Sequence, residues 1–217
     1  MQKIVFGITG LTLGGAERVL VDIANELSGK FNITMFTLYG KGEFEKELSP
    51  NVKLVNMIDK SYNELTKNEK VKISLKILFN KKSIYNKYIK NKFDTEIAFL
   101  EGPITRIFSV ENKGIKKIAW VHNDIGQVFG KNFKAKIKRM LDKTCYSKYN
   151  EVVFVSNDNK EQFEEIYKLN NDKIVIPNYI SSKRVIKKSE EQFENVFEDG
   201  TVNFLTVARL VSQKAID

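Results

Sequence analysis

Residues Gly10–Arg18 have the sequence GLTLGGAER, and this stretch decides the fold class of the chain. It follows an apolar run at Lys3–Thr9 that is typical of a buried parallel strand. The residues after it recur at the spacing of a buried helix face, at Val19, Leu20, Ile23, Ala24 and Leu27. The glycines therefore mark a strand-to-helix corner, where unpaired backbone N–H groups favour an anion or a sugar hydroxyl. The same glycines would equally suit a tight turn that packs the helix close to the strand.

Length and composition are those of a globular protein with a substantial core. The chain has 217 residues, of which 42% are hydrophobic and 29% are charged. The single Cys145 excludes an intramolecular disulfide, and we expect it to fill the core. We expect no metal, because no group of histidines and cysteines has metal-ligand spacing. With neither a signal peptide nor a long apolar run, the sequence predicts a cytoplasmic protein.

Apolar runs alternate with amphipathic segments along the chain. Further strands are expected at Phe31–Tyr39, Val52–Ile58, Asp94–Leu100, Ile115–Val121, Val152–Val155, Lys173–Ile176 and Thr201–Ala208. Helices are expected after Gly15, over 68–92 as one or two helices, over 131–148, and after Ser156. The pattern predicts an α/β fold, a Rossmann-like parallel sheet flanked by helices.

The distribution of apolar residues also suggests where domains end. Residues 178–200 contain few of them and predict a linker. The linker would join an N-terminal domain at 1–177 to the start of a second domain at 201–217. We therefore expect the sequence to be the N-terminal portion of a longer protein.

Polar residues follow two of the predicted central strands. Glu101 ends one strand, and His122 with Asn123 ends the next. Ligands of an open parallel sheet bind outside the carboxyl ends of its strands, so the glycine corner, Glu101 and His122 are predicted to share one cleft. A histidine that only caps a strand end is the alternative for His122.

Six motifs in order give the chain a resemblance to a known family. They are GGAER at 14–18, FLEG at 99–102, WVHND at 120–124, VSN at 155–157, VIPNYI at 175–180 and ARLVSQKAID at 208–217. With these motifs the sequence resembles family 4 glycosyltransferases, which have two facing Rossmann-like domains known as the GT-B fold. The resemblance implies that this chain is the N-terminal, acceptor-side half of such a fold together with the first strand of the donor-binding domain.

The resemblance implies roles for the matching residues. Arg209 and Lys214 look like the basic pair that binds the donor diphosphate, and Gly14 with Gly15 looks like the loop on the opposite wall of the cleft. His122 looks like the active-site histidine near the transferred sugar. Other residues that would line the cleft are Glu17, Glu101, Asn123 and Asn178. For Glu17 we favour a simpler role, as a first-turn anion at a helix N-terminus.

The resemblance also implies a reaction. A retaining transferase would move a hexose-type sugar from a nucleotide diphosphate sugar to a glycan or lipid-linked acceptor, without a metal ion or cofactor. Synthesis of a bacterial surface polysaccharide, such as a capsule, is the pathway that the family suggests. Residues 1–217 alone are expected to be inactive.

The net charge of +9 indicates an anionic partner. Two basic amphipathic stretches suggest docking on the anionic inner face of the plasma membrane, through Lys81, Lys82, Lys87, Lys90 and Phe129. Helices that bury an apolar stripe and leave lysines in solvent are one alternative, and a lysine content set by the base composition of the genome is another. A nucleic-acid-binding domain is disfavoured, because no helix-turn-helix, RNA-binding aromatic motif or zinc pattern accompanies the lysines.

A short-chain dehydrogenase is the competing enzyme class. Thr9-Gly10 with Gly14 resembles a TGxxxG loop, and Tyr88 with Lys92 satisfies YxxxK. Against this, Ala16 replaces the last glycine of a dinucleotide loop, and the second strand ends without an acid to bind a ribose.

Overall fold

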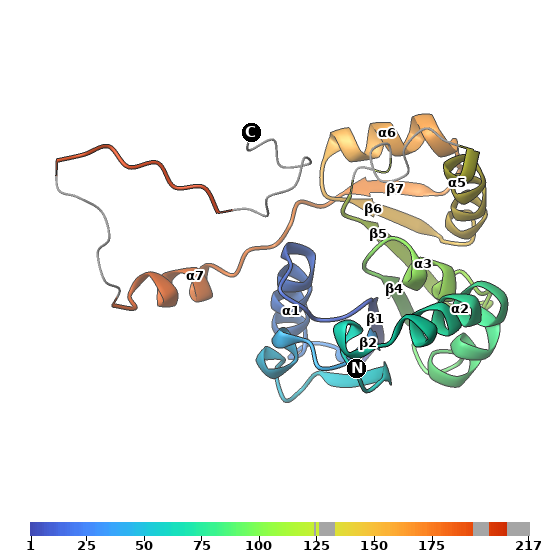
Figure 1. The fold of residues 1–217 in the computed structure, drawn as a ribbon, viewed down its shortest axis with the longest axis horizontal. Coiled ribbons are helices and arrows are strands. Elements are labelled where there is room, and N and C mark those ends of the chain that lie inside the picture. Colours follow the sequence, from blue (N-terminus) through green and yellow to red (C-terminus); the bar gives the residue numbers. More distant parts are fainter. Residues whose placement is uncertain (124, 126–132, 193–199, 208–217) are drawn as a thin grey trace. The chain divides into compact units, whose positions relative to one another are not determined.

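The computed structural model describes residues 1–123, 125, 133–192 and 200–207. The chain forms two compact units, Met1–Ile180 and Ser181–Asp217, which are described separately. The first unit contains the sheet and its covering helices (Figure 1).

All strands of the first unit run parallel, in the order β3-β2-β1-β4-β5-β6-β7. They are β1 (Lys3–Ile8), β2 (Asn32–Tyr39), β3 (Lys53–Ile58), β4 (Thr95–Ala98), β5 (Lys116–Val121), β6 (Glu151–Phe154) and β7 (Asp172–Val175). The order reverses between β1 and β4, which are neighbours although a long stretch of sequence separates them. Ligands bind at such a switch point, so the carboxyl ends of β1, β4 and β5 are the natural place for a site.

Helices connect the strands. They are α1 (Gly15–Leu27), α2 (Lys67–Tyr88), α3 (Pro103–Phe108), α5 (Phe133–Tyr146) and α6 (Asn157–Tyr167), with short 3-10 turns η1 (Glu43–Glu47) and η2 (Tyr62–Glu64). Thr66 begins α2 in a capping box, because its hydroxyl accepts from the backbone N–H of Glu69 while the Glu69 carboxylate accepts from the backbone N–H of Thr66. Asn80 has non-helical backbone angles inside α2, so the stretch predicted as one or two helices is a kinked helix.

The sheet separates two apolar cores. On one face, side chains of α2, α3, α5 and α6 pack on the strands around Tyr85, Phe108, Phe154 and Phe163. On the other face, α1 covers β1, β2 and β4, with Leu20 among its fully buried residues. Cys145 is buried, as predicted. The predicted α/β class with a parallel sheet flanked by helices is confirmed, and the seven strands of the first unit agree with the predicted runs to within a few residues.

The second unit contains helix α7 (Ser182–Ser189), which the hydroxyl of Ser181 caps by accepting from the backbone N–H of Arg184. This helix lies within the stretch predicted as a linker. The predicted strand at 201–208 is wrong for residues 201–207, which form no regular element. A strand needs a hydrogen-bonded neighbour, and the apolar side chains here are exposed, Phe204 at 94%. The domain boundaries proposed from the sequence remain predictions.

Candidate functional site

The glycine corner opens α1. Gly14 is the N-cap residue and has an extended backbone, and Gly15 is the first helical residue. A Cβ added to Gly14 would collide with the Glu17 carboxylate, whereas a Cβ added to Gly15 would meet no atom within 4 Å. Packing against the described residues therefore does not require glycine at position 15. Glu17 lies in the first turn of α1, as predicted for an anion at the positive helix end.

Arg18, the last residue of the GGAER motif, anchors the corner. Its guanidinium pairs with Asp22 at 2.8 Å and with Glu47 at 2.5 Å. It also lies 4.6 Å from the ring centre of Phe44. These contacts tie α1 to η1, so this arginine holds the shape of the corner.

The Glu101 carboxylate accepts hydrogen bonds from the two residues that follow β5. Its Oε1 accepts from the backbone N–H groups of His122 at 2.5 Å and Asn123 at 2.7 Å, and its Oε2 accepts from Asn123 Nδ2 at 2.9 Å. Burial raises the pKa of Glu101, and the hydrogen bonds from Asn123 and His122 oppose this rise. The structure thus joins three predicted site residues, and Glu101 positions the other two.

The ring of His122 lies against two aromatic side chains. Its ring centre lies 4.5 Å from that of Phe99 and 6.1 Å from that of Trp120, which stacks on it. Burial lowers the pKa of His122 to about 4, so the imidazole is neutral at pH 7. Its Nε2 is buried without a hydrogen-bond partner in the described part of the chain, as is Trp120 Nε1. A buried unpaired polar atom is costly, so a ligand group that bonds His122 Nε2 would gain affinity.

A cavity of about 550 Å³ adjoins the glycine corner. We call it the corner cavity; it is lined by Thr9, Gly10, Thr12, Leu13, Glu17, Tyr39, Gly40, Lys41, Glu43, Ser61, Tyr62 and Asn63. Tyr39 and Tyr62 meet edge to face with ring centres 5.2 Å apart, and burial together with Tyr62 raises the pKa of Tyr39. Aromatic faces beside carboxylates, hydroxyls and amides suit a sugar, which has both apolar C–H faces and hydroxyl groups.

The sequence did not identify most of the corner cavity. Tyr39 was recognised only as the end of a strand, and Tyr62 and Asn63 lie in a connection without a motif. Their one available signal was position, because they follow the carboxyl ends of β2 and β3.

A second, smaller cavity of about 240 Å³ adjoins Glu101. Leu100, Pro103, Ile125 and Tyr146 supply apolar walls, and Lys138 and Asp142 also line it. The corner cavity and this Glu101 cavity have no lining residue in common, and neither is lined by Gly14 or His122. Among the described residues, the glycine corner and Glu101 therefore adjoin two separate cavities rather than the single predicted cleft.

The remaining predicted residues have varied locations. Asn178 is exposed, beyond the end of the edge strand β7. Arg209, Lys214 and Phe129 lie outside the described residues. Lys82, Lys87 and Lys90 are exposed. Lys81 is half-buried and donates to Ser109 Oγ at 2.9 Å. The membrane-facing role of these four lysines stays a prediction.

The dehydrogenase alternative fails on geometry. Tyr88 and Lys92 line a cavity together with Lys3 and Asn32, the first residues of β1 and β2. The glycine corner follows the other end of β1. The tyrosine and lysine of the YxxxK pattern are therefore at the opposite end of the sheet from the glycines that they would have to serve.

Two kinds of feature are absent among the described residues. No group of three or more His, Cys, Asp and Glu side chains is arranged to hold a metal ion. No helix in these parts of the chain is both long and apolar enough to cross a membrane.

Comparisons with known proteins agree with this fold. The family profile described as Glycosyltransferase Family 4 matches residues 13–184. No curated protein matches the sequence. The structure of Anabaena Alr3699/HepE in complex with UDP and glucose is similar at a TM-score of 0.55 and 14% identity, covering 88% of this chain and 50% of that one.

Two further solved structures show the same relation. The HepE complex with UDP-glucose gives a TM-score of 0.54 at 14% identity, covering 88% of this chain and 49% of that one. Glycyrrhiza uralensis UGT73P12, complexed with glycyrrhetinic acid 3-O-monoglucuronide, gives 0.50 at 9% identity, covering 81% and 48%. The chain thus spans about half the length of these structures. At such identities the likeness shows the fold, and it supports the predicted correspondence to one half of a GT-B enzyme.

Proposed function

Because this chain belongs to Glycosyltransferase Family 4, we propose that it is the acceptor-side part of an enzyme that uses a nucleotide diphosphate sugar. The titles of the HepE structures name UDP, UDP-glucose and glucose, which supports a donor of this type. The acceptor hydroxyl oxygen would bond to the anomeric carbon of a hexose as the bond from that carbon to the diphosphate breaks on the same face. The hydroxyl proton would pass to the departing diphosphate.

The unpaired Nε2 of His122 is the observation that carries this proposal. The neutral ring can donate a hydrogen bond to, or accept one from, a hydroxyl of the transferred sugar, as its tautomer dictates. Glu101 holds the backbone of His122, so the ring is positioned before the substrate arrives. Arg209 and Lys214 are proposed to bind the donor diphosphate.

The corner cavity is proposed to hold the acceptor. Tyr39 and Tyr62 offer ring faces to a sugar, and Glu43 and Asn63 offer hydrogen-bond partners for its hydroxyls. The open space at Gly15 leaves room for substrate to approach the start of α1. A glycan acceptor of a bacterial surface polysaccharide fits this chemistry.

The test uses the enzyme as its gene encodes it, with UDP-sugars and glycan acceptors. We expect His122→Ala to lower kcat about 100-fold, since it removes a hydrogen bond at the reacting sugar. Gly15→Val should raise KM by filling the open space. Exposed Glu161→Gln on α6 is the control and should leave the rate unchanged. Full activity of His122→Ala in a folded protein would refute the proposed site.

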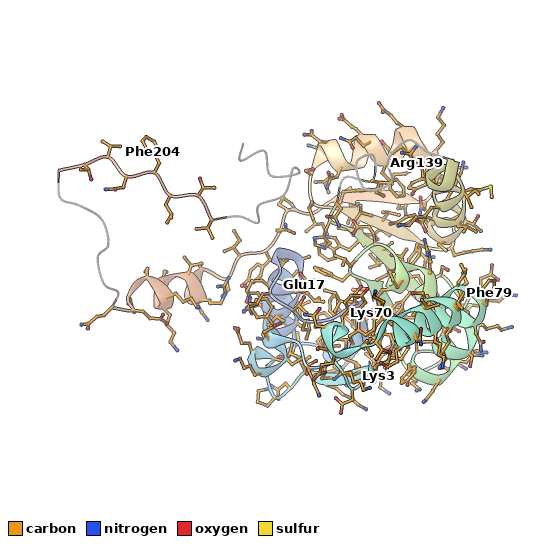
Figure 2. The ribbon with its side chains drawn as sticks, in the orientation of Figure 1. Lys3, Glu17, Lys70, Phe79, Arg139 and Phe204 are labelled. Carbon is orange, nitrogen blue, oxygen red and sulfur yellow. The ribbon has the colours of Figure 1, made fainter. Side chains whose placement is uncertain are left out.

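Membrane docking is proposed through α2, on a surface that differs from the predicted lysines. Val71, Leu75, Leu78 and Phe79 are exposed, Phe79 at 80%, and Figure 2 shows Phe79 at the periphery of the first unit. Lys72 and Lys76 are exposed among them. Exposed apolar side chains beside lysines suit an anionic lipid surface, where each lysine contributes about 1 kcal/mol. A lipid-linked acceptor at the inner face of the plasma membrane would then be within reach.

Sedimentation with vesicles tests this docking surface. We expect wild-type protein to sediment with anionic vesicles and not with neutral ones, and Leu75→Ser with Phe79→Ser to abolish sedimentation. Lys160, which is partly exposed on α6, offers a control, since Lys160→Gln should sediment normally. Unchanged sedimentation of the double variant would exclude α2 as the docking surface.

A further inference from the structure

A cavity of about 530 Å³ lies at the amino ends of the strands, opposite the proposed catalytic edge. We call it the amino-end cavity; it is lined by Lys3, Asn32, Ile33, Thr34, Asn51, Lys53, Val55, Tyr88, Lys92 and Phe93. Lys3, Asn32 and Lys53 are the first residues of β1, β2 and β3. Because β1 is 6 residues long, the cavity is about 20 Å from the glycine corner.

The charges on this cavity have one sign. Lys3, Lys53 and Lys92 line it, and no aspartate or glutamate does. Across the described residues, none of these three ammonium groups is within 4.0 Å of a carboxylate, although Lys3 donates its backbone N–H to Asp94 at 2.8 Å. Like charges gathered at one cavity repel each other, and a bound anion would reverse that unfavourable interaction.

The strand pairing explains why the lysines converge. In the parallel register Lys3 is beside Asn32, and Lys53 is beside Thr34. Side chains alternate between the two faces of a strand, and Lys3 is two residues from Val5, which belongs to the core under α2. Lys3, Asn32, Thr34 and Lys53 therefore share the α2 face, and the lysines flank the polar groups of β2.

The same cavity has an apolar side. Val55, Tyr88 and Phe93 all pack against the core under α2. The ring centre of Tyr88 is 5.4 Å from that of Phe36, which fixes the ring in place. Lys92 contributes from the connection between α2 and β4, and its Nζ donates to the carbonyl of Lys87 at 2.6 Å. A planar or apolar group can therefore contact Tyr88 and Phe93 while an attached anion reaches the lysines.

We propose that the amino-end cavity binds a small organic phosphate. The phosphate is held by Lys3, Lys53 and Lys92, and the apolar body of the ligand lies against Tyr88 and Phe93. This site is separate from the proposed catalytic edge and does not depend on the glycosyltransferase activity. A phosphate can also belong to a lipid headgroup; we assign a free ligand, because the apolar contacts lie within the cavity.

Calorimetric titration of the whole protein with phenyl phosphate tests the site, with phenol and inorganic phosphate as separate arms. Phenyl phosphate should bind more tightly than either part alone. We expect Lys53→Gln and Lys92→Gln each to weaken its binding about 5-fold to 10-fold, since each removes one charge-assisted contact. The matched control is Lys143→Gln, an exposed lysine on α5, and His122→Gln is the control for the catalytic edge.

Three results would overturn the proposal. If Lys53→Gln and Lys92→Gln bound phenyl phosphate as tightly as wild type, these lysines would not hold the phosphate. If inorganic phosphate bound as tightly as phenyl phosphate, the ring of the ligand would make no favourable contact with Tyr88 and Phe93. Loss of binding to anionic vesicles in the same variants, with no binding of phenyl phosphate to wild type, would assign the lysines to a lipid surface.

Discussion

An ionisable side chain lies at each end of strand β5, Lys117 near its start and His122 just after its end, and the two differ in their hydrogen bonding. At its start, Lys117 Nζ contacts Glu96 at 2.6 Å, the carbonyls of Phe108 and Val110 at 2.7 Å, and Tyr85 OH at 3.2 Å. Just after its end, His122 Nε2 has no partner in the described part of the chain. Saturated polar contacts in a core favour a structural role, whereas an unpaired buried nitrogen at a ligand-binding edge favours a functional one.

The pKa shifts of Lys117 and His122 show the same difference, because only Lys117 has a charged partner among the described residues. Burial lowers the pKa of Lys117, and the charge of Glu96 opposes the shift. Burial also lowers the pKa of His122, and no charge among the described residues opposes it. Glu96 therefore favours the charged form of Lys117 against the effect of burial, whereas the surroundings of His122 favour its neutral ring.

The largest expected change in stability is for a substitution near the amino end of β5. Lys117→Met leaves the Glu96 carboxylate buried without its cation, and we expect the free energy of unfolding to fall by about 3–5 kcal/mol. Urea denaturation followed by circular dichroism measures the loss. Adding Glu96→Gln should recover more than half of it, because Gln still accepts from Tyr85 and carries no charge. A double variant no more stable than Lys117→Met would show that the buried charge is not the cause.

The sequence predicted the strands of the sheet better than it predicted which polar side chains are buried in the core. Apolar runs mark the strands, so even the four buried residues Thr95–Ala98 were within a predicted strand. In IKKIAWV, however, Lys116 and Lys117 look alike, and only alternation assigns them to opposite faces. Lys116 is exposed and Lys117 is buried, because the tertiary structure places Glu96 beside the second one only.

The candidate site was predictable where residues end strands. Glu101 and His122 were identified because both follow predicted strands, and the structure joins them. The contact of His122 with Phe99 was not predictable, since it requires the register of β4 against β5. Tyr62 was missed for a similar reason, because its position depends on the path of the chain after β3.

His122, just after the carboxyl end of β5, should make the stability of the protein depend on pH. The unfolded His122 binds a proton near pH 6.5, whereas the folded ring does so near pH 4. Between these values the unfolded state holds more protons, so stability is complete above about pH 6.5 and falls as the pH drops towards 4. The loss amounts to at most about 3 kcal/mol, at 1.36 kcal/mol per unit of pKa difference. The difference in unfolding free energy between wild type and His122→Gln, measured across this range, isolates it.

A pH-independent difference between the two proteins would mean that His122 titrates normally and is not held neutral. Since other carboxyl groups also titrate in this range, only the difference between wild type and His122→Gln is informative. Below about pH 4 both states are protonated and the difference should be constant.

The smallest effect is expected for an ion pair near the amino end that is not buried. Lys148 Nζ is 2.5 Å from Glu111 Oε1, and the two side chains are 42% and 70% exposed. Lys148 lowers the pKa of Glu111, yet solvent screens the pair and both long side chains lose freedom when they meet. Glu111→Gln should therefore leave the urea midpoint unchanged at low and at high ionic strength. If it instead lowered the midpoint as far as Lys117→Met does, ion pairing rather than burial would set the stability of this end. The contrast with His122 would then need another cause.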